Sequence, residues 1–246
     1  RAGFPAWDDL FTGVSQALHD WTPCGATTLE WVANRCQSLH DGAVETRYSD
    51  LGYITLAWIL QDRFGSRLQT LAPRWSWSGS LDASRRRHCL PTGWCDARQR
   101  TAQGEVNDTN CWVLGGIAGH AGVFATLTDV ARWAMELLNT DRGRTTSRDR
   151  GVLQMFWDPA NRMGDETWVM GWDTPSPGQS TAGSRVSAST VGHLGFTGTS
   201  LWIDREADAL VVLLSNRVEH GPSSKPLMRA FRPRFHDIIF DALGRA

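Results

Sequence analysis

The chain has 246 residues, of which 41% are hydrophobic and 21% charged, a composition typical of a folded globular protein that excludes a disordered or collagen-like chain. Its longest uninterrupted apolar run is the six residues 209–214, far short of the ~20 residues that cross a bilayer, so we expect no transmembrane helix. The net charge of -1 and the pI near 6.7 give no electrostatic reason to expect a nucleic-acid partner.

Two helices are predicted in the first third of the chain. The first begins at Thr27 and Glu30, which have the spacing of a capping box. The second follows Asp50 and stops at Gly65. Its apolar stripe consists of Leu51, Ile54 and Trp58, with Leu56, Ile59 and Leu60 beside it. Residues 66–110 lose this periodicity, and because they are too many for a structureless loop we expect them to be packed or functional.

A glycine cluster separates this region from the next helix. Residues 115–122 hold four glycines among eight positions, which indicates tight backbone geometry, and no P-loop lysine follows them. A helix capped by Thr126 or Thr128 comes next, and a short one is predicted at 153–157.

The last part of the chain changes to a period of two. Strands are predicted at 168–172, 191–196, 199–204 and 209–216. The last is apolar on both faces, as in a central strand, and residues 205–208 form the turn before it. An amphipathic helix is predicted to begin at Pro233 and to bury Phe235, Ile238, Ile239 and Ala242. The fold class is therefore α+β: an antiparallel sheet flanked by helices in residues 151–246, after a mainly helical region in 1–150, all in one domain spanning 1–246.

Several kinds of site are disfavoured by the sequence. There is no G-x-S-x-G elbow, no G-x-x-x-x-G-K-[ST] loop and no H-E-x-x-H helix. The seven histidines lack ligand spacing, so we expect no metal site and no cofactor. Cys89 and Cys95 could form a disulfide, but the odd number of five cysteines favours small apolar fillers and leaves the compartment open.

Three segments stand out when they are taken together. They are Tyr48-Ser49-Asp50 before a helix, the glycine cluster around His120, and residues 193–198 at the end of a strand. With residues 104–108 (Gly-Glu-Val-Asn-Asp) and 192–216, they make the chain resemble the serine β-lactamase and penicillin-binding-protein superfamily, specifically its class C-like, esterase-type branch. The resemblance covers nearly the whole chain.

The resemblance implies a set of site residues. Tyr48 matches the tyrosine that serves as general base, Asp50 stands where the family often has asparagine, and His193 matches the third-motif residue on the strand that edges the site. The oxyanion and substrate-binding residues would be Gly195, Phe196 and Thr197, with the Phe196 N–H in the oxyanion hole.

The nucleophile motif of that family, Ser-x-x-Lys, is absent from these residues. Lys225 is the only lysine among 25 basic residues, and the residue three before it is Pro222. The chain starts at Arg1 without a signal-like segment, so we expect a processed chain or an internal fragment. The resemblance implies that Ser-x-x-Lys would stand upstream of these residues, in an N-terminal part that they lack. Losing that part would also expose an edge strand of the sheet.

These departures predict a change in activity. A phenol has a pKa near ~10, so without the lysine Tyr48 stays neutral, and a carboxylate at Asp50 reinforces this. We therefore expect no acyl transfer by these residues alone. With an upstream Ser-x-x-Lys segment, we expect hydrolysis of a small-molecule ester, amide or peptidoglycan-like substrate. Neutral His193 and negative Asp50 favour a neutral ester or amide over a β-lactam, because they disfavour the carboxylate of the β-lactam.

A non-catalytic alternative remains open at this stage. The fold could be kept as a binding module, since Asn107 and Gly93 stand where relatives often carry histidine and glutamate. Asp50 is also a plain first-turn acid favoured by the helix dipole, and His120 is expected to be a loop histidine rather than an acid or base.

Overall fold

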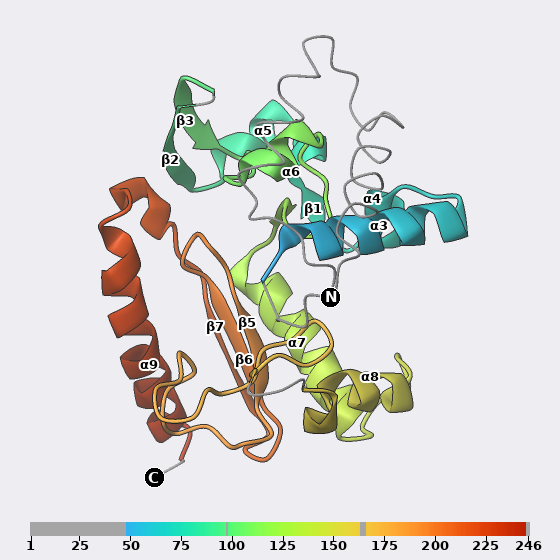
Figure 1. The fold of residues 1–246 in the computed structure, drawn as a ribbon, viewed down its shortest axis with the longest axis vertical. Helices are drawn as coiled ribbons and strands as arrows, with labels where there is room; N and C mark the ends of the chain where they lie inside the picture. Colours follow the sequence, from blue (N-terminus) through green and yellow to red (C-terminus); the bar gives the residue numbers. More distant parts are fainter. Residues whose placement is uncertain (1–47, 97, 163–165, 245–246) are drawn as a thin grey trace, which may run out of the picture. The chain divides into compact units, whose positions relative to one another are not determined.

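The structure is a computed structural model that describes residues 48–96, 98–162 and 166–244 (Figure 1). The chain divides into two compact units, Arg1–Ala125 and Thr126–Ala246, and each is described by itself. Helices combine with small antiparallel sheets in both units, which confirms the α+β class. The predicted helix with the Thr27 and Glu30 capping box lies outside the described residues. No helix in the described part of the chain is both long and apolar enough to cross a membrane.

The main helix of the first unit is α3, Asp50–Phe64, and it ends where the sequence predicts. The Ser49 hydroxyl accepts a hydrogen bond from the Leu51 N–H at the start, and Gly65 closes the helix in a left-handed conformation with φ 58°. Leu51, Ile54 and Ala57 are buried on one face. Trp58 is 37% exposed, so its predicted place on the buried stripe is wrong, because the smaller Ala57 points into the core instead.

The described residues of the region 66–110 are packed, as expected, and up to residue 125 the chain forms only short elements. These are α4 (Leu68–Leu71), β1 (Ser76–Trp77), η1 (Ser78–Ser80), α5 (Ala83–Arg87), β2 (Pro91–Cys95), β3 (Arg100–Gln103), α6 (Thr109–Val113) and β4 (Val123–Phe124). Strand β1 pairs with β4 and β2 with β3, both antiparallel. The core of this unit consists of Leu51, Ile54, Val106, Cys111, Leu114 and Ala118. None of the three described cysteines, Cys89, Cys95 and Cys111, forms a disulfide.

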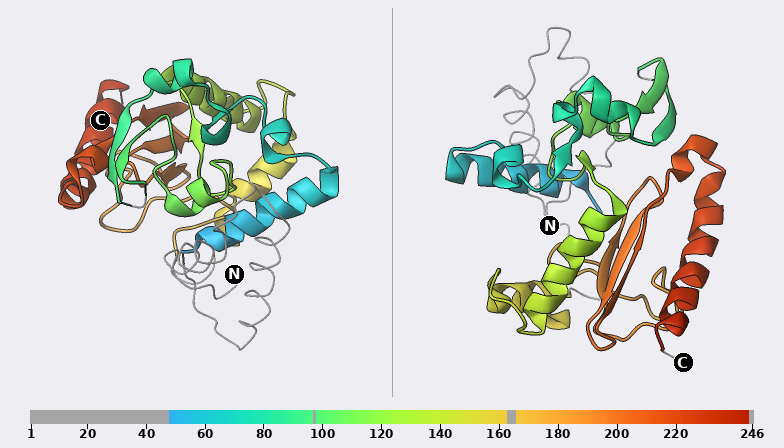
Figure 2. Two further views of the ribbon diagram at one scale, coloured as in Figure 1. Left: turned by 90° about the horizontal axis from the view of Figure 1, so that it is seen from above. Right: turned by 180° about the vertical axis from the view of Figure 1, so that it is seen from behind.

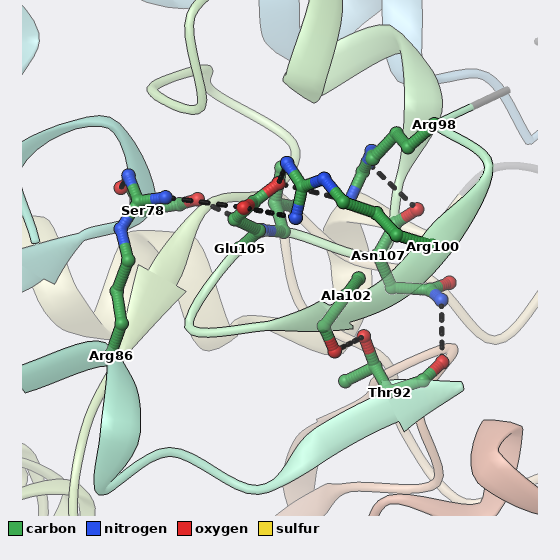
Figure 3. Close-up of polar contacts among 9 residues, drawn as sticks. Ser78, Arg86, Thr92, Arg98, Arg100, Ala102, Glu105 and Asn107 are labelled. Atoms are coloured by element: carbon green, nitrogen blue, oxygen red, sulfur yellow. Dashed lines mark hydrogen bonds and ion pairs between the residues drawn. The ribbon is translucent and has the colours of Figure 1, made fainter. Parts of the chain in front are cut away.

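A cluster of three arginines around one buried glutamate joins these short elements, and we call it the arginine cluster (Figure 3). Glu105, whose side chain is 9% exposed, forms ion pairs with Arg100 at 2.6 Å, Arg86 at 3.2 Å and Arg98 at 3.8 Å. Arg98 is 1% exposed and stacks over the Trp112 ring. A buried glutamate needs such partners because an unpaired buried charge is costly.

Two helices begin the second unit. Helix α7, Leu127–Asp141, starts at Thr126, whose hydroxyl and backbone form a capping box with Asp129, so the first of the two predicted caps is the one used. Helix α8, Arg150–Trp157, confirms the predicted short helix and begins earlier, because the Asp149 side chain caps it. A 3-10 turn, η2 (Pro159–Asn161), follows.

The sheet of this unit has the antiparallel order β5-β6-β7, formed by Val191–Leu194, Ser200–Asp204 and Ala209–Leu213. All five residues of β6 are buried, so β6 is the central strand. Strand β7, predicted to be central, lies at an edge among the described strands. Helices α7 and α9 cover opposite faces of this sheet (Figure 2).

Two predictions for this unit are wrong. Residues 168–172 form a turn, closed by the Val169 N–H donating to the Trp172 carbonyl with Gly171 at φ 80°, rather than a strand. After the 3-10 turn η3 (Arg217–His220), helix α9 runs over Ser224–Ala242, so it begins before Pro233, which lies inside it. Its buried face carries Arg232, His236 and Phe240, while Ile238 is 67% exposed and Ala242 is exposed too.

Candidate functional site

The structure places Tyr48 and Asp50 at the start of α3. Tyr48 precedes the helix and is 57% exposed, and Asp50 is its first residue, where a carboxylate interacts favourably with the helix dipole. Among the described residues, the Asp50 carboxylate has no hydrogen bond or ion pair. This part of the predicted site therefore consists of the Tyr48 phenol and the half-buried Asp50 carboxylate, two positions apart in the sequence.

The glycine cluster, residues 115–122, packs directly against α3. A Cβ on Gly119 would lie 2.0 Å from the Tyr53 carbonyl oxygen, so only glycine allows this approach. A Cβ on Gly122, at φ 110°, would lie 2.5 Å from the Gly116 carbonyl oxygen. The glycines serve backbone geometry, as predicted, and they place His120 beside the first turn of α3.

His120 forms a hydrogen-bonded pair with Asp108. Its Nε2 lies 2.9 Å from Asp108 Oδ1, and the His120 side chain is 3% exposed. The same Asp108 oxygen accepts a hydrogen bond from the Cys111 N–H and so caps α6. The expectation that His120 is an unremarkable loop histidine is therefore incomplete, since it is buried and paired with a carboxylate.

The surroundings of this cluster change the proton affinity of Asp50, Asp108 and the nearby Tyr48. Burial is the main cause that raises the pKa of Asp50, and His120 partly opposes it while Asp108 adds to it. Burial alone would raise the pKa of Asp108, but the hydrogen bond and charge of His120, together with backbone N–H groups, hold it below its usual range. Partial burial, then Asp50, Tyr53 and Asp108, raise the pKa of the Tyr48 phenol.

Asp50, Asp108 and His120 also form a possible donor set for a cation. Each offers one oxygen or nitrogen atom, and these atoms lie within 4.8 Å of one another. The sequence spacing did not predict this set, because 58 residues separate Asp50 from Asp108. The mutual hydrogen bond of Asp108 and His120 already accounts for their approach, and we assign no metal to the cluster.

The second half of the predicted site lies in the other unit, at the end of β5. His193 is a half-buried residue of β5, and its Nδ1 lies 2.8 Å from the Leu194 carbonyl oxygen. The strand ends at Leu194, before Gly195, Phe196 and Thr197, which form a tight turn to β6. The predicted strand 191–196 is therefore two residues too long, and the predicted oxyanion residues lie in the turn.

Residues 195–199 form what we call the motif turn, and two arginines hold it. Arg232 of α9 donates through Nη2 to the Gly195 and Thr199 carbonyls at 2.9 and 2.7 Å. The Arg217 guanidinium lies over the 65% exposed Phe196 ring, 4.7 Å from its centroid. Sequence reasoning missed both arginines, because nothing in their local pattern links them to residues 195–199.

Comparison with known proteins identifies the family. The sequence model of the Beta-lactamase family matches residues 1–230. The chain therefore belongs to the Beta-lactamase family. The solved structure of a β-lactamase from Mycobacterium bovis resembles this family member with a TM-score of 0.54 and 18% sequence identity, over 85% of this chain and 68% of that one, which shows a shared fold.

Curated family relatives bear a more specific name. Proteins of Salmonella agona and Salmonella typhi, each named a putative D-alanyl-D-alanine carboxypeptidase, are 27% identical to this chain over 252 residues, and one of Salmonella enteritidis is 26% identical over 257. The matches cover 92% of this chain and 57% of each relative. The chain thus spans a little more than half the length of these relatives.

Proposed function

We propose that the chain is the part of a serine hydrolase that carries the tyrosine and third-motif elements of an acyl-enzyme site. The reaction would be hydrolysis of an ester or amide, and the names of the Salmonella relatives favour a peptidoglycan-like D-alanyl substrate. The observation that carries the proposal is the family match over residues 1–230, which includes Tyr48, Asp50 and the motif turn.

In this reaction a serine hydroxyl attacks the carbonyl carbon, and its proton passes to a base. Tyr48 would take or relay that proton, and by the family resemblance His193 is the third-motif residue. The N–H groups of the motif turn, with Phe196 first, would stabilise the negative oxygen of the tetrahedral intermediate. The tetrahedral intermediate then collapses: the bond to the leaving amine or alcohol breaks, that group takes up the proton held by the base, and an acyl-serine remains. Water attacks the acyl-serine, releases the acid product and restores the serine hydroxyl.

These 246 residues contain no Ser-x-x-Lys motif. Lys225 is the only lysine, and the residue three positions before it is Pro222 rather than a serine. The raised pKa of Tyr48 keeps its phenol protonated near neutrality, so Tyr48 alone is a poor base. We therefore propose that the chain by itself forms no acyl-enzyme and that activity requires a segment bearing this motif.

Covalent labelling tests separately whether the chain alone is inactive and whether activity requires Ser-x-x-Lys. The purified chain is incubated with p-nitrophenyl acetate and with a fluorophosphonate, and burst-phase release and the intact mass are measured. We expect no burst and no adduct, and an adduct on the chain alone would contradict its predicted inactivity. A fusion to the Ser-x-x-Lys segment of a Salmonella relative should show one adduct that disappears when the serine becomes alanine.

A binding module is the second candidate, favoured by the absence of any Ser-x-x-Lys from the sequence. It predicts that the chain binds a D-alanyl-D-alanine peptide without cleaving it. Isothermal titration with diacetyl-lysyl-D-alanyl-D-alanine distinguishes the two. If the chain binds this peptide and the Ser-x-x-Lys fusion is never acylated, the binding module is favoured.

A further inference from the structure

The proposed reaction leaves the Asp108–His120 pair without a role. The pair is more ordered than a loop histidine requires. The His120 side chain is 3% exposed, and its Nε2 lies 2.9 Å from Asp108. Glycine at position 119 allows the loop to reach α3. A buried imidazole held by a carboxylate is the arrangement that fixes a ring in one orientation.

The group that this pair faces is Asp50. One donor atom of each of the three side chains lies within 4.8 Å of the others, which is close enough for their charges to interact strongly. Among the described residues, the half-buried Asp50 carboxylate has no hydrogen bond or ion pair of its own. A carboxylate in that setting needs either a nearby positive charge or a proton.

We propose that His120, held in place by Asp108, is the positioning residue that sets the charge of Asp50 and, through Asp50, the proton affinity of Tyr48. The inference rests on the proposed function, in which Tyr48 handles the proton of the reaction. His120 touches neither substrate nor serine in this proposal and acts only through Asp50.

Counting protons shows what the pair can do. One proton of the cluster forms the bond between His120 Nε2 and Asp108. A second proton can lie on His120 Nδ1, with Asp50 a carboxylate, or on Asp50, with the imidazole neutral, and the net charge is the same in both cases. A positive charge on His120 lowers the pKa of Asp50, so the pair acts in favour of the first arrangement, in which Asp50 is a carboxylate.

The second arrangement makes position 50 resemble the asparagine of the family. A neutral carboxylic acid offers one O–H donor and one carbonyl acceptor, much as an amide offers N–H and C=O. It also places no negative charge beside the Tyr48 phenol. Loss of His120 would favour this neutral form, so the pair decides whether position 50 carries a negative charge or resembles an asparagine.

Other groups face the pair and take part in its titration. Tyr48 comes from the segment just before α3, and Cys111 comes from α6. Arg98 of the arginine cluster interacts with the charge of Asp108. These groups are common to all the variants below, so differences between variants report the pair itself.

The first test measures Asp50 directly. The chain is labelled with ¹³C at aspartate carboxyl carbons, and the Asp50 signal is identified by its loss in Asp50→Asn. In His120→Gln the titration midpoint of Asp50 should rise by about 0.6 to 2.5 pH units, the range for a unit charge removed at about 5 Å. The exposed His88→Gln is the matched control and should leave the midpoint unchanged.

The second test measures the phenol and does not require that His120→Gln folds. Tyr48 and Tyr53 are the only tyrosines, so in Tyr53→Phe the absorbance at about 295 nm reports Tyr48 alone. Asp50→Asn in this background should lower the Tyr48 midpoint. An unchanged Asp50 midpoint in folded His120→Gln, or an unchanged Tyr48 midpoint in Asp50→Asn, would overturn the proposal.

Two further outcomes are decisive. If a tenfold excess of Zn²⁺ moves the Asp50 signal of the unmodified chain but not of His120→Gln, the cluster is a metal site and the proposal fails. If both titrations behave as expected while the Ser-x-x-Lys fusion forms no adduct, the charge coupling stands and the proposed function fails. If the Ser-x-x-Lys fusion is acylated while neither titration midpoint changes, the proposed function stands and the charge coupling fails.

Discussion

Glu105 at the centre of the arginine cluster provides the sharpest test of what holds the first unit together. In Glu105→Gln the carboxylate charge disappears while the shape is kept. Arg86 and Arg100 are 35% and 52% exposed, so each lost pair costs about 0–1 kcal/mol. Arg98 is 1% exposed and would remain as an uncompensated buried charge, for which the cost is about 3–5 kcal/mol.

Because glutamine can still accept a hydrogen bond, we take the lower end and expect a loss of about 3 kcal/mol at pH 7. With an m-value of about 2 kcal/mol/M, the urea midpoint of the first unit should fall by roughly 1.5 M. Trp112, which stacks on Arg98, makes tryptophan fluorescence a suitable signal. Asp208→Asn, which removes an exposed pair with Arg144, is the control and should leave the midpoint unchanged.

The same variant has a pH signature. Burial alone would raise the pKa of Glu105, but the Arg100 hydrogen bond and the charges of Arg100, Arg86 and Arg98 bring it below its usual 4.5. A depressed carboxyl pKa gives stability that is present above 4.5 and is lost as the pH falls through the folded-state value. The difference in free energy of unfolding between the wild type and Glu105→Gln should therefore become smaller in acid. A loss below about 1 kcal/mol at pH 7, or a difference that is independent of pH, would refute the reasoning.

Three other predictions follow from the contacts. Gly119→Ala should lower the urea midpoint, with a loss of about 1–3 kcal/mol in the free energy of unfolding, because the new Cβ meets the backbone of α3. Gly52→Ala, with open space around it in the helix, should instead raise the free energy of unfolding by about 0.5–1 kcal/mol. Effects of the same sign in the two variants would contradict this. Asp50→Asn should stabilise the chain at pH 7 more than at pH 3, since a raised carboxyl pKa makes the wild type lose stability as the pH rises above 3.8, and parallel pH profiles would count against it. Arg232→Met should speed amide exchange in residues 195–199 about tenfold, and unchanged exchange would mean that the two carbonyl bonds do not hold the motif turn.

Local signals made much of the fold predictable. Gly65 ends α3, Thr126 caps α7, and the turn before β7 contains Asp208 at φ 53°, a conformation that aspartate tolerates. In each case the residue that fixes the backbone lies at the boundary it defines. Sequence therefore predicted these elements to within a few residues.

The errors arose where polar residues are buried. Helix α9 packs through Arg232 and His236, which hold the motif turn and the Ser200 hydroxyl, so a search for apolar periodicity selects another face and begins the helix at Pro233. The strand predicted at 168–172 has apolar residues at alternate positions, but Gly171 reverses the chain there. In both regions tertiary contacts decided the outcome.

The candidate site was predictable only in its motif residues. Tyr48, Asp50 and His193 came from a resemblance, whereas the role of Asp108 and the burial of His120 depend on a packing contact at Gly119. No spacing rule connects positions 50, 108 and 120. The cluster could be found only once the loop was seen against α3.

The near absence of lysine limits which groups can transfer protons in this chain. Arginine stays charged in proteins, so its 24 arginines can orient and stabilise but cannot act as bases near neutrality. Carboxyl and imidazole groups are then the ones that can gain or lose a proton between about pH 4 and 8. Of the described histidines, His236 is tied to Ser200 and the Thr181 carbonyl, and burial lowers its pKa. His120 and His193 lie in the motif segments instead, so unless another segment brings a lysine, the side-chain bases that these motifs offer near neutrality are carboxylates and imidazoles.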